Sequence, residues 1–191
     1  FGVTGATDEV YHTTITIGTE TEIYNVALEV YGIYITEMAD FNYFANTPSA
    51  DNYYYLAKDI DATGFEFDYD SWTVIPPCGT GLVGVFEGDG HVISNLTGKT
   101  CGLFGIVAGG TVRNVAFTNV KLTGYYASLI GHKESGKATL KNVYVQVDSI
   151  GVRGGGLYQQ SFSNTGTHEN IMVVYDISQE DVKTVMAQED N

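Results

Sequence analysis

Three asparagines recur at one spacing in the second half of the chain, and this spacing constrains the fold more than any other feature. Asn142 follows Asn114 by 28 residues and Asn170 follows Asn142 by another 28, with Asn95 a shorter step upstream. Around Asn114 and Asn142, an apolar residue lies two positions before the asparagine, and others lie one and three positions after it. Repeats this short cannot bury their own apolar face, so they indicate stacked coils.

A second apolar column runs in step with the asparagines. Its members are Val85-Phe86-Glu87-Gly88, Leu103-Phe104-Gly105, Leu129-Ile130-Gly131 and Leu157-Tyr158. The repeats are rich in β-branched and aromatic residues, lack a helical apolar period and are separated by glycines, which favours strands over helix pairs. The sequence therefore predicts an all-β fold, a short β-helix (β-solenoid) with small capping helices, preceded by a partial antiparallel β-sandwich.

The asparagines are predicted to turn the corners of this solenoid, because asparagine tolerates left-handed backbone angles. Their amides can then bond one another from coil to coil, which satisfies polar atoms next to a narrow core. We therefore expect Asn95, Asn114, Asn142 and Asn170 to form one structural ladder, with Arg113 and Lys141 pointing outward. His168 takes an apolar position of the column, so the core is expected to thin and end in that coil.

Residues 1–35 follow a different pattern. Thr13 to Ile17 and Ile23 to Ile35 alternate in polarity, as antiparallel strands with one wet face do. Two or three strands are too few for independent stability. We therefore expect them to be the end of an immunoglobulin-like β-sandwich. A larger parent chain or a neighbouring subunit would complete it.

Two short helices are predicted at the borders of the solenoid, which spans residues 36–177. In the first, Thr36 is the expected N-cap, and Met38, Phe41 and Phe44 form an apolar stripe. Such a helix suits an open solenoid end, where unpaired backbone and core must be covered. The second lies within residues 178–191, where Ser178 begins a capping box and Val182, Val185 and Met186 form a stripe.

Composition indicates an extracellular setting, on a cell or virion surface. Nine basic against 23 acidic residues give a net charge of −14, which disfavours nucleic acid and anionic lipid as partners. No apolar run is long enough to cross a membrane. The chain begins without Met, so we expect a processed product or a piece of a longer protein.

The cysteines and histidines indicate no metal site or cofactor. Cys78 and Cys101 are 23 residues apart, close to one coil, so they are either a disulfide or two small buried thiols. The four histidines are scattered without zinc-ligand spacing. Asp59 and Asp61 are candidates for Ca²⁺ together with Asp68 or Asp70, but turn chemistry accounts for them better.

Several motifs occur in an order that resembles a known family. They are Tyr55 to Asp61, Trp72 with Ile75-Pro76, Phe86 to Leu96, and Gly102-Leu103-Phe104-Gly105. Over about residues 36 to 160 the chain is similar to the GLUG-type repeat region of large bacterial surface proteins, and similar modules occur in phage fibres and virion decoration proteins. The resemblance implies a β-helical, surface-displayed module without catalytic residues.

A β-helical carbohydrate-active enzyme is the competing class. Glu87, Asp89 and His91 alternate and offer an acid, a base and an imidazole. Gly88 and Gly90 lie between them, however, which indicates a tight turn rather than a strand face. A structural role for the three is therefore preferred, and no catalytic residue is assigned.

The tyrosines are the stronger functional lead. Six are candidates for an aromatic surface that stacks on sugar rings or contacts a protein: Tyr53, Tyr54, Tyr55, Tyr125, Tyr126 and Tyr144. The alternative is that tyrosine is simply a good strand former. The function expected from the sequence is a non-enzymatic structural or adhesive module of a bacterial envelope protein or phage virion, binding a surface glycan or a partner protein.

Overall fold

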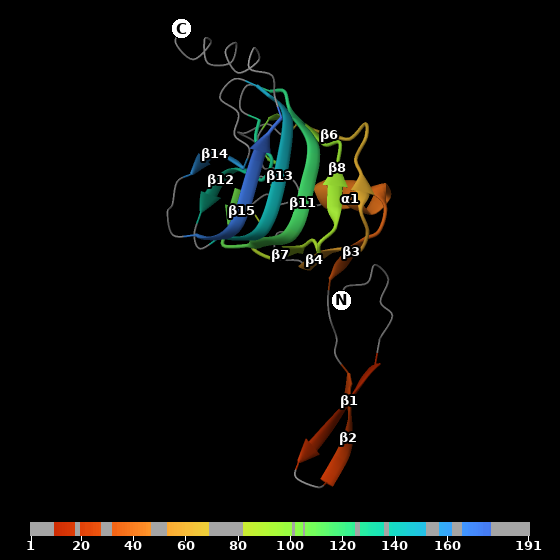
Figure 1. The fold of residues 1–191 in the computed structure, drawn as a ribbon. Helices are drawn as coiled ribbons and strands as arrows, with labels where there is room; N and C mark the ends of the chain where they lie inside the picture. The colour runs from red at the N-terminus through yellow and green to blue at the C-terminus, as the bar shows by residue number, and fades with distance from the viewer. Residues whose placement is uncertain are drawn as a thin grey trace.

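The computed structural model describes residues 10–17, 20–27, 32–46, 53–68, 82–100, 102–104, 106–124, 127–135, 138–151, 157–161 and 166–176. Cys78, Cys101, Asp70, Tyr125, Tyr126 and residues 178–191 lie outside these ranges. The described elements are shown in Figure 1 and are β1 (Val10–Ile17), β2 (Glu20–Ala27), β3 (Ile33–Ile35), α1 (Met38–Asn46), β4 (Tyr53–Leu56), β5 (Ile60–Asp61), β6 (Glu66–Asp68), β7 (Val85–Glu87), β8 (Val92–Ser94), β9 (Thr97–Thr100), β10 (Ile106–Ala108), β11 (Thr111–Leu122), β12 (Gly131–Ser135), β13 (Thr139–Ile150), β14 (Tyr158–Ser161) and β15 (Thr167–Tyr175).

The main body is a β-solenoid, as predicted. Its larger sheet runs in the order β15-β13-β11-β7-β4-β3, and a second sheet runs β10-β12-β14. The strands of both sheets pair in parallel, and the strand that follows β11 by one coil is β13, with Thr111 opposite Thr139. Strands β5 and β6 pair in parallel with β8 and β9, which in turn pair with β11. Successive coils therefore lie directly on one another.

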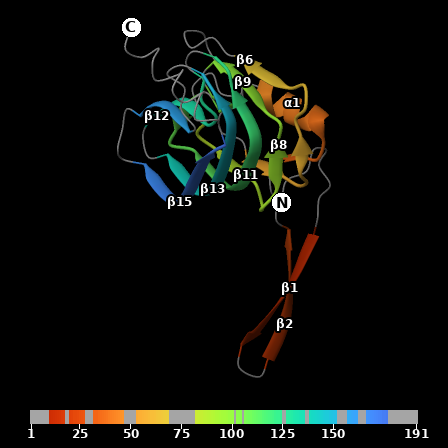
Figure 2. The same ribbon diagram turned by 45° about the horizontal axis from the view of Figure 1, so that its top comes forward.

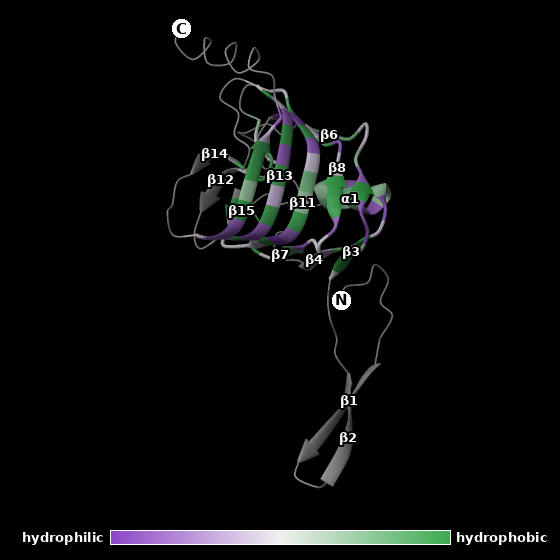
Figure 3. Ribbon diagram, in the orientation of Figure 1, coloured by the Kyte–Doolittle hydropathy of each residue, from purple (hydrophilic) through white to green (hydrophobic). Residues whose placement is uncertain are grey.

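The corner asparagines explain how one strand both lines the core and turns. Within β11, Val112 and Val115 are buried although two residues separate them, because Asn114 between them has a φ of 55°. A left-handed residue interrupts the strict alternation of a strand and turns the chain. The same arrangement recurs in β13 around Asn142, which has a φ of 52°. Figure 3 shows the resulting bands of matching hydropathy across β11, β13 and β15.

The two apolar columns of the sequence are both real, but one segment was assigned to the wrong column. Leu103 and Leu129 are buried, and the backbone N–H of Leu103 donates to the carbonyl of Leu129 at 2.7 Å. The segment Val85–Glu87 instead pairs with Thr111–Arg113 of β11. It therefore belongs to the asparagine column, and Leu82, bridged to Val107, precedes it in the other sheet.

Helix α1 closes the solenoid at its N-terminal end. Phe41, Phe44 and Ala45 are completely buried, and the ring of Phe44 contacts those of Phe86 and Phe104 at centroid separations of 5.2 and 5.7 Å. Figures 1 and 2 show α1 at one end of the solenoid and β15 at the other. The predicted capping role of this helix is confirmed for its apolar face.

The start of α1 differs from the prediction in its cap. Thr36 does not accept a bond from the helix; its hydroxyl and its backbone N–H donate to the carboxylate of Asp40, at 2.6 and 2.9 Å. The N–H of Glu37 donates to the same oxygen at 3.2 Å, and the carbonyl of Glu37 accepts the first helical bond from Phe41. Burial opposes ionisation of Asp40, but these hydrogen bonds prevail and lower its pKa. Asp40 thus reaches back to cap its own helix.

The N-terminal strands form a hairpin, with β1 and β2 pairing antiparallel from Val10 opposite Ala27 to Ile17 opposite Glu20. The antiparallel strands predicted here are confirmed, while one hairpin gives only loose support for the predicted β-sandwich. The segment Ile33–Ile35, expected to belong with these strands, is β3 and pairs in parallel with β4. The solenoid sheet therefore begins before α1.

Candidate functional site

The corner asparagines form a directional hydrogen-bonded ladder. The amide nitrogen of Asn170 donates to the Oδ1 of Asn142 at 2.9 Å, and that of Asn142 donates to the Oδ1 of Asn114 at 2.7 Å. Every donor points toward the N-terminal end of the solenoid. Three of the four asparagines predicted to stack do so.

Asn95 is the exception, and it belongs to a second ladder at another corner. It accepts a bond at 3.1 Å from the amide of Asn119 and donates to Asp61 at 2.8 Å. Asn95 and Asn119 both have positive φ, of 63° and 53°. Asn119 was missed because its column does not continue: two residues of β11, Thr118 and Asn119, lie opposite the single residue Gln146 of β13. The single-corner register predicted for Asn95 is therefore wrong.

A carboxylate ends each ladder at its N-terminal side. Asn114 donates to the Oε1 of Glu87 at 2.9 Å, and the backbone N–H of Asp89 donates to the same oxygen at 2.9 Å. The other oxygen of Glu87 accepts from the Nε of Arg113. Glu87 is only 6% exposed, so these three donors take the place of the water that would otherwise hydrogen-bond its carboxylate.

Asp61 ends the second ladder and also shapes a turn. Its Oδ1 accepts from the backbone N–H and the hydroxyl of Thr63, at 3.0 and 2.6 Å, as well as from Asn95. The hydrogen bonds from Thr63 and Asn95 lower the pKa of Asp61. The turn chemistry predicted for this residue is thus confirmed.

Glu87, Asp89 and His91 surround a tight turn and do not converge on one point. The N–H of His91 donates to the carbonyl of Gly88 at 2.8 Å, and Asp89 and Gly90 have φ of 50° and 84°. A Cβ on Gly88 would overlap the carbonyl oxygen of Asn114 in the next coil, so the backbones meet closely here. The turn predicted for this segment is confirmed.

The side chains of Asp89 and His91 are bonded to the preceding coil, whereas that of Glu87 is bonded to the following one. The hydroxyl of Tyr55 donates to the Oδ2 of Asp89, and this bond raises the pKa of Tyr55 to about 12. The Nδ1 of His91 lies 2.9 Å from the Oδ1 of Asp59, which also accepts from the N–H of Val92. The bond from Val92, followed by that with His91, lowers the pKa of Asp59.

A row of outward residues crosses the larger sheet at one level, and we call it the outer row. Its members occupy successive register positions and are Tyr34, Tyr55, Glu87, Arg113, Lys141 and Glu169. The rings of Tyr34 and Tyr55 are in contact, with centroids 4.9 Å apart. The rest of the row forms ion pairs, with Lys141 and Glu169 at 3.0 Å. One end of the row is therefore aromatic and the other charged.

Tyr53 flanks the aromatic end of the outer row. Its hydroxyl accepts from a terminal nitrogen of Arg113 at 3.4 Å, and the Glu87 and Tyr53 bonds together raise the pKa of Arg113. Tyr34, Tyr53 and Tyr55 are half-buried, so part of each ring faces solvent. Hydrogen bonds hold the hydroxyls of Tyr53 and Tyr55, and the ring of Tyr34 contacts that of Tyr55. Side chains that are already ordered lose little entropy when they contact a partner.

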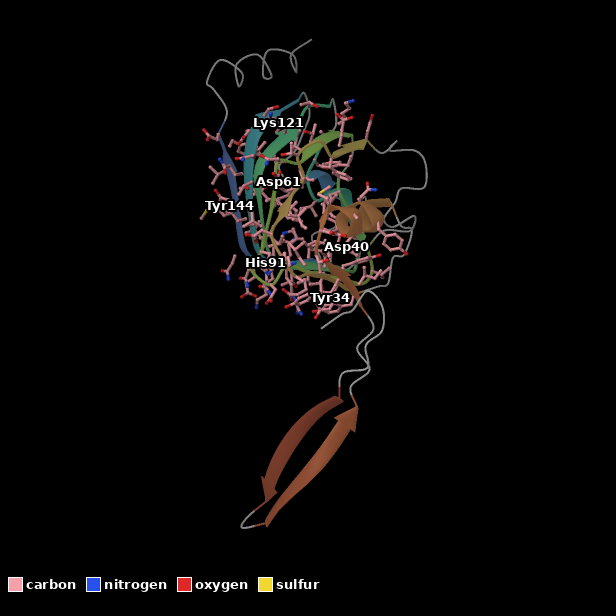
Figure 4. All side chains as sticks on the ribbon, turned by 90° about the vertical axis from the view of Figure 1, so that its right-hand side faces the viewer. Tyr34, Asp40, Asp61, His91, Lys121 and Tyr144 are labelled. Carbon is pink, nitrogen blue, oxygen red and sulfur yellow. The ribbon has the colours of Figure 1, made fainter. Side chains whose placement is uncertain are left out.

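The predicted tyrosines have separate fates. Tyr54 is completely buried against Phe44, so its assignment to a binding surface was wrong: alternation in β4 sends it into the core. Tyr144 is half-buried on the outer face of β13 opposite Met172. Figure 4 shows it near the β15 side of the solenoid, apart from Asp40 of α1. Tyr55, predicted with Tyr53, is half-buried on the outer face of β4. Tyr34 was not predicted as a surface residue, and the alternation of Ile33, Tyr34 and Ile35 is the available signal.

Asp59, Asp61 and Asp68 do not form a metal site within the described ranges, where no three potential ligands come together. No helix of the described chain is long and apolar enough to span a membrane. The chain matches no protein-family model, no curated protein and no solved structure.

Proposed function

We propose that the chain is a non-enzymatic, surface-displayed module of a bacterial envelope protein or phage virion, which acts as a rigid spacer and binds neutral glycan. The observation that carries the proposal is that four carboxylates are hydrogen-bonded to residues of neighbouring coils. Glu87 and Asp61 end the ladders, Asp89 holds Tyr55, and Asp59 pairs with His91. Carboxylates committed to joining coils are not placed as an acid and base about a shared substrate.

The aromatic end of the outer row is the proposed contact surface. Tyr34, Tyr53 and Tyr55 present partly exposed rings whose positions are set by Asp89 and Arg113. Ring faces of fixed orientation stack on sugar rings with little loss of side-chain entropy. A net charge of −14 disfavours acidic polysaccharides and leaves neutral sugars as the matching class. The GLUG-type resemblance supports display on a surface.

The test is retention on columns of immobilised neutral glycans, followed by assay of reducing ends released from the same glycans. Retention of the full chain without release is expected. The double variant Tyr34→Ala, Tyr55→Ala should lose retention, whereas Tyr43→Ala, a change at an exposed tyrosine on α1 (56%), should keep it. Reducing-end release that disappears in Asp89→Asn would overturn the proposal and favour a carbohydrate-active enzyme.

A further inference from the structure

One face of the solenoid carries no charged side chain in four neighbouring described strands. It is formed by β8 and by the segments of β11, β13 and β15 that follow the corner of Asn114, Asn142 and Asn170. Its outward residues alternate with buried or partly buried ones along each strand. We call them the uncharged face, and they are Val92, Ser94, Ala116, Thr118, Tyr144, Gln146, Met172 and Val174.

The charges of the same coils lie around this face. Before the corner, the same strands carry Arg113, Lys141 and Glu169. In the coil before β8, Asp61 takes the register position of Ser94. In a chain with a net charge of −14, a face without charge is where a second negatively charged body can approach without direct repulsion between side chains.

One row of the uncharged face is apolar or aromatic from coil to coil. It consists of Val92, Ala116, Tyr144 and Met172, which are register partners in succession. Met172 is 59% exposed, and contiguous exposed apolar side chains mark contact sites. Figure 4 shows Tyr144 and Tyr34 on different sides of the solenoid, so this face is separate from the tyrosine surface proposed to bind glycan.

We propose that the uncharged face binds the same face of a second copy of the chain, with the two solenoids running in opposite directions. A two-fold axis parallel to the strands, between β11 and β13, places Ala116 of each copy opposite Tyr144 of the other. The same axis places Val92 opposite Met172. Small side chains then face large ones along the whole row, as in well-packed layers.

The order of sizes selects this orientation. A two-fold axis along the solenoid would instead place Tyr144 on Tyr144 and Ala116 on Ala116, which crowds one coil and leaves a void at the next. The axis parallel to the strands also places Thr118 opposite Gln146, and both side chains can donate and accept hydrogen bonds. Strands of the two copies are then aligned, as in the common packing of two sheets.

The size of the face predicts a weak dimer. Four strands about 4.8 Å apart, each contributing five residues at about 3.3 Å, cover a flat area of roughly 300 Å² per copy. Two such areas fall below the roughly 1,000 Å² of a stable complex, so pairing requires high concentration or many copies displayed together. Net charge opposes pairing at long range and salt screens it, so the dimer should tighten as salt is added.

The experiment measures the solution mass of the full chain by light scattering, over a series of protein concentrations at low and high salt. The parent should dimerise at the highest concentrations, more readily at high salt. Ala116→Glu and Tyr144→Lys each place a charge on the uncharged face and should weaken dimerisation at least tenfold. Thr111→Glu and Thr139→Lys, on the same two strands before the asparagine corner, are the matched controls and should dimerise like the parent.

A mixture of the Ala116→Glu and Tyr144→Lys proteins tests the orientation. In a mixed pair the introduced carboxylate of one copy faces the introduced ammonium of the other, while the second contact between Ala116 and Tyr144 is unchanged. The mixture should therefore dimerise at least threefold more tightly than either variant alone. If the axis ran along the solenoid, the two introduced charges would not meet and mixing would have no effect.

Several outcomes would overturn the proposal. They are a parent that stays monomeric at every concentration, controls that weaken the dimer as much as the variants, and a mixture no tighter than its components. Neutral-glycan retention that Tyr144→Lys abolishes in a monomeric parent would assign the face to glycan instead. Far-ultraviolet circular dichroism checks that each variant folds. If one does not, Thr118→Glu and Gln146→Lys, the other facing pair, replace the two variants with the same expected results.

Discussion

The two ends of the solenoid are built differently. At the N-terminal end, helix α1 covers the core, and the ring of its Phe44 packs against those of Tyr54 and Phe86. At the C-terminal end, Met172 is 59% exposed and His168 has replaced an apolar core residue. The end covered by α1, which we call the closed end, therefore has a core rich in aromatic residues. The described part of the other end has fewer buried apolar side chains.

The ladders show why the ends cannot be equivalent. Each amide donates toward the N-terminal side, so the first member must accept without donating onward. Carboxylates meet this requirement, and Glu87 and Asp61 are the two first members. The last member, Asn170, requires a donor instead. The direction of the amides thus determines which polar group each end needs.

The largest expected effect comes from the closed end. Phe44→Ala should lower the free energy of unfolding by about 3–5 kcal/mol, because it removes a buried ring and leaves a cavity. Met172→Ala, at the other end, should cost less than about 1 kcal/mol because the side chain is mostly exposed. Denaturant unfolding of both variants measures the difference. Equal costs would contradict the difference in burial between the two ends.

Glu87→Gln is expected to destabilise the chain by roughly 3 kcal/mol. The neutral side chain brings an amide donor next to the donors of Asn114, Asp89 or Arg113, in a buried position. Glu169→Gln is the matched control at the other end of the outer row and should cost at most about 1 kcal/mol, because that pair is exposed. Thermal unfolding of both variants is the measurement. A Glu87→Gln protein as stable as the parent would refute the role of Glu87 as ladder terminus.

Asn142→Leu should cost about 1–3 kcal/mol, since it leaves the Oδ1 of Asn114 without its donor and removes the acceptor for Asn170. It also places a branched side chain at a φ of 52°. Asn170→Leu breaks only one ladder bond and should cost less. Denaturant midpoints of the two variants would rank them. A larger loss for Asn170→Leu would show that the ladder matters more at its open end.

The smallest expected effect is a loss of local stability at low pH at the closed end. The pKa values of Asp40, Asp59 and Asp61 are lowered from their ordinary value of 3.8. Their contribution to stability is therefore complete above about pH 4 and is lost as the pH falls through the folded-state values. Amide exchange between pH 5 and pH 3, corrected for intrinsic rates, should show earlier loosening in α1 and β5 than in β13. Uniform loosening would contradict this order.

The sequence predicted the repeat, the β-solenoid and the N-terminal cap because these depend on local patterns. The 28-residue spacing places Asn114, Asn142 and Asn170 together, and the stripe of Phe41 and Phe44 buries α1. Strand alternation and helical period are properties of neighbouring residues, which a single sequence displays.

The parts that were missed depend on register between unlike coils. Glu87 was taken for a turn residue because it lies one position before the asparagine column, in register with Arg113, and meets Asn114 only through its side chain. The second ladder escaped notice because its steps are uneven: Asn119 and Asn95 are 24 residues apart, and Asn95 and Asp61 are 34 apart. The numbers of residues between these positions differ, so the pairing is decided by packing and not by spacing.

The regular spacing of the asparagine ladder also means that whole coils can be added to the solenoid. A duplication of one 28-residue unit around Asn142 would add a coil whose asparagine accepts from the coil above and donates to the coil below, with both termini unchanged. Each such insertion would lengthen the solenoid by about 4.8 Å, the separation of neighbouring strands. The length of the solenoid, and with it the distance between its two ends, can therefore change in fixed increments of one coil.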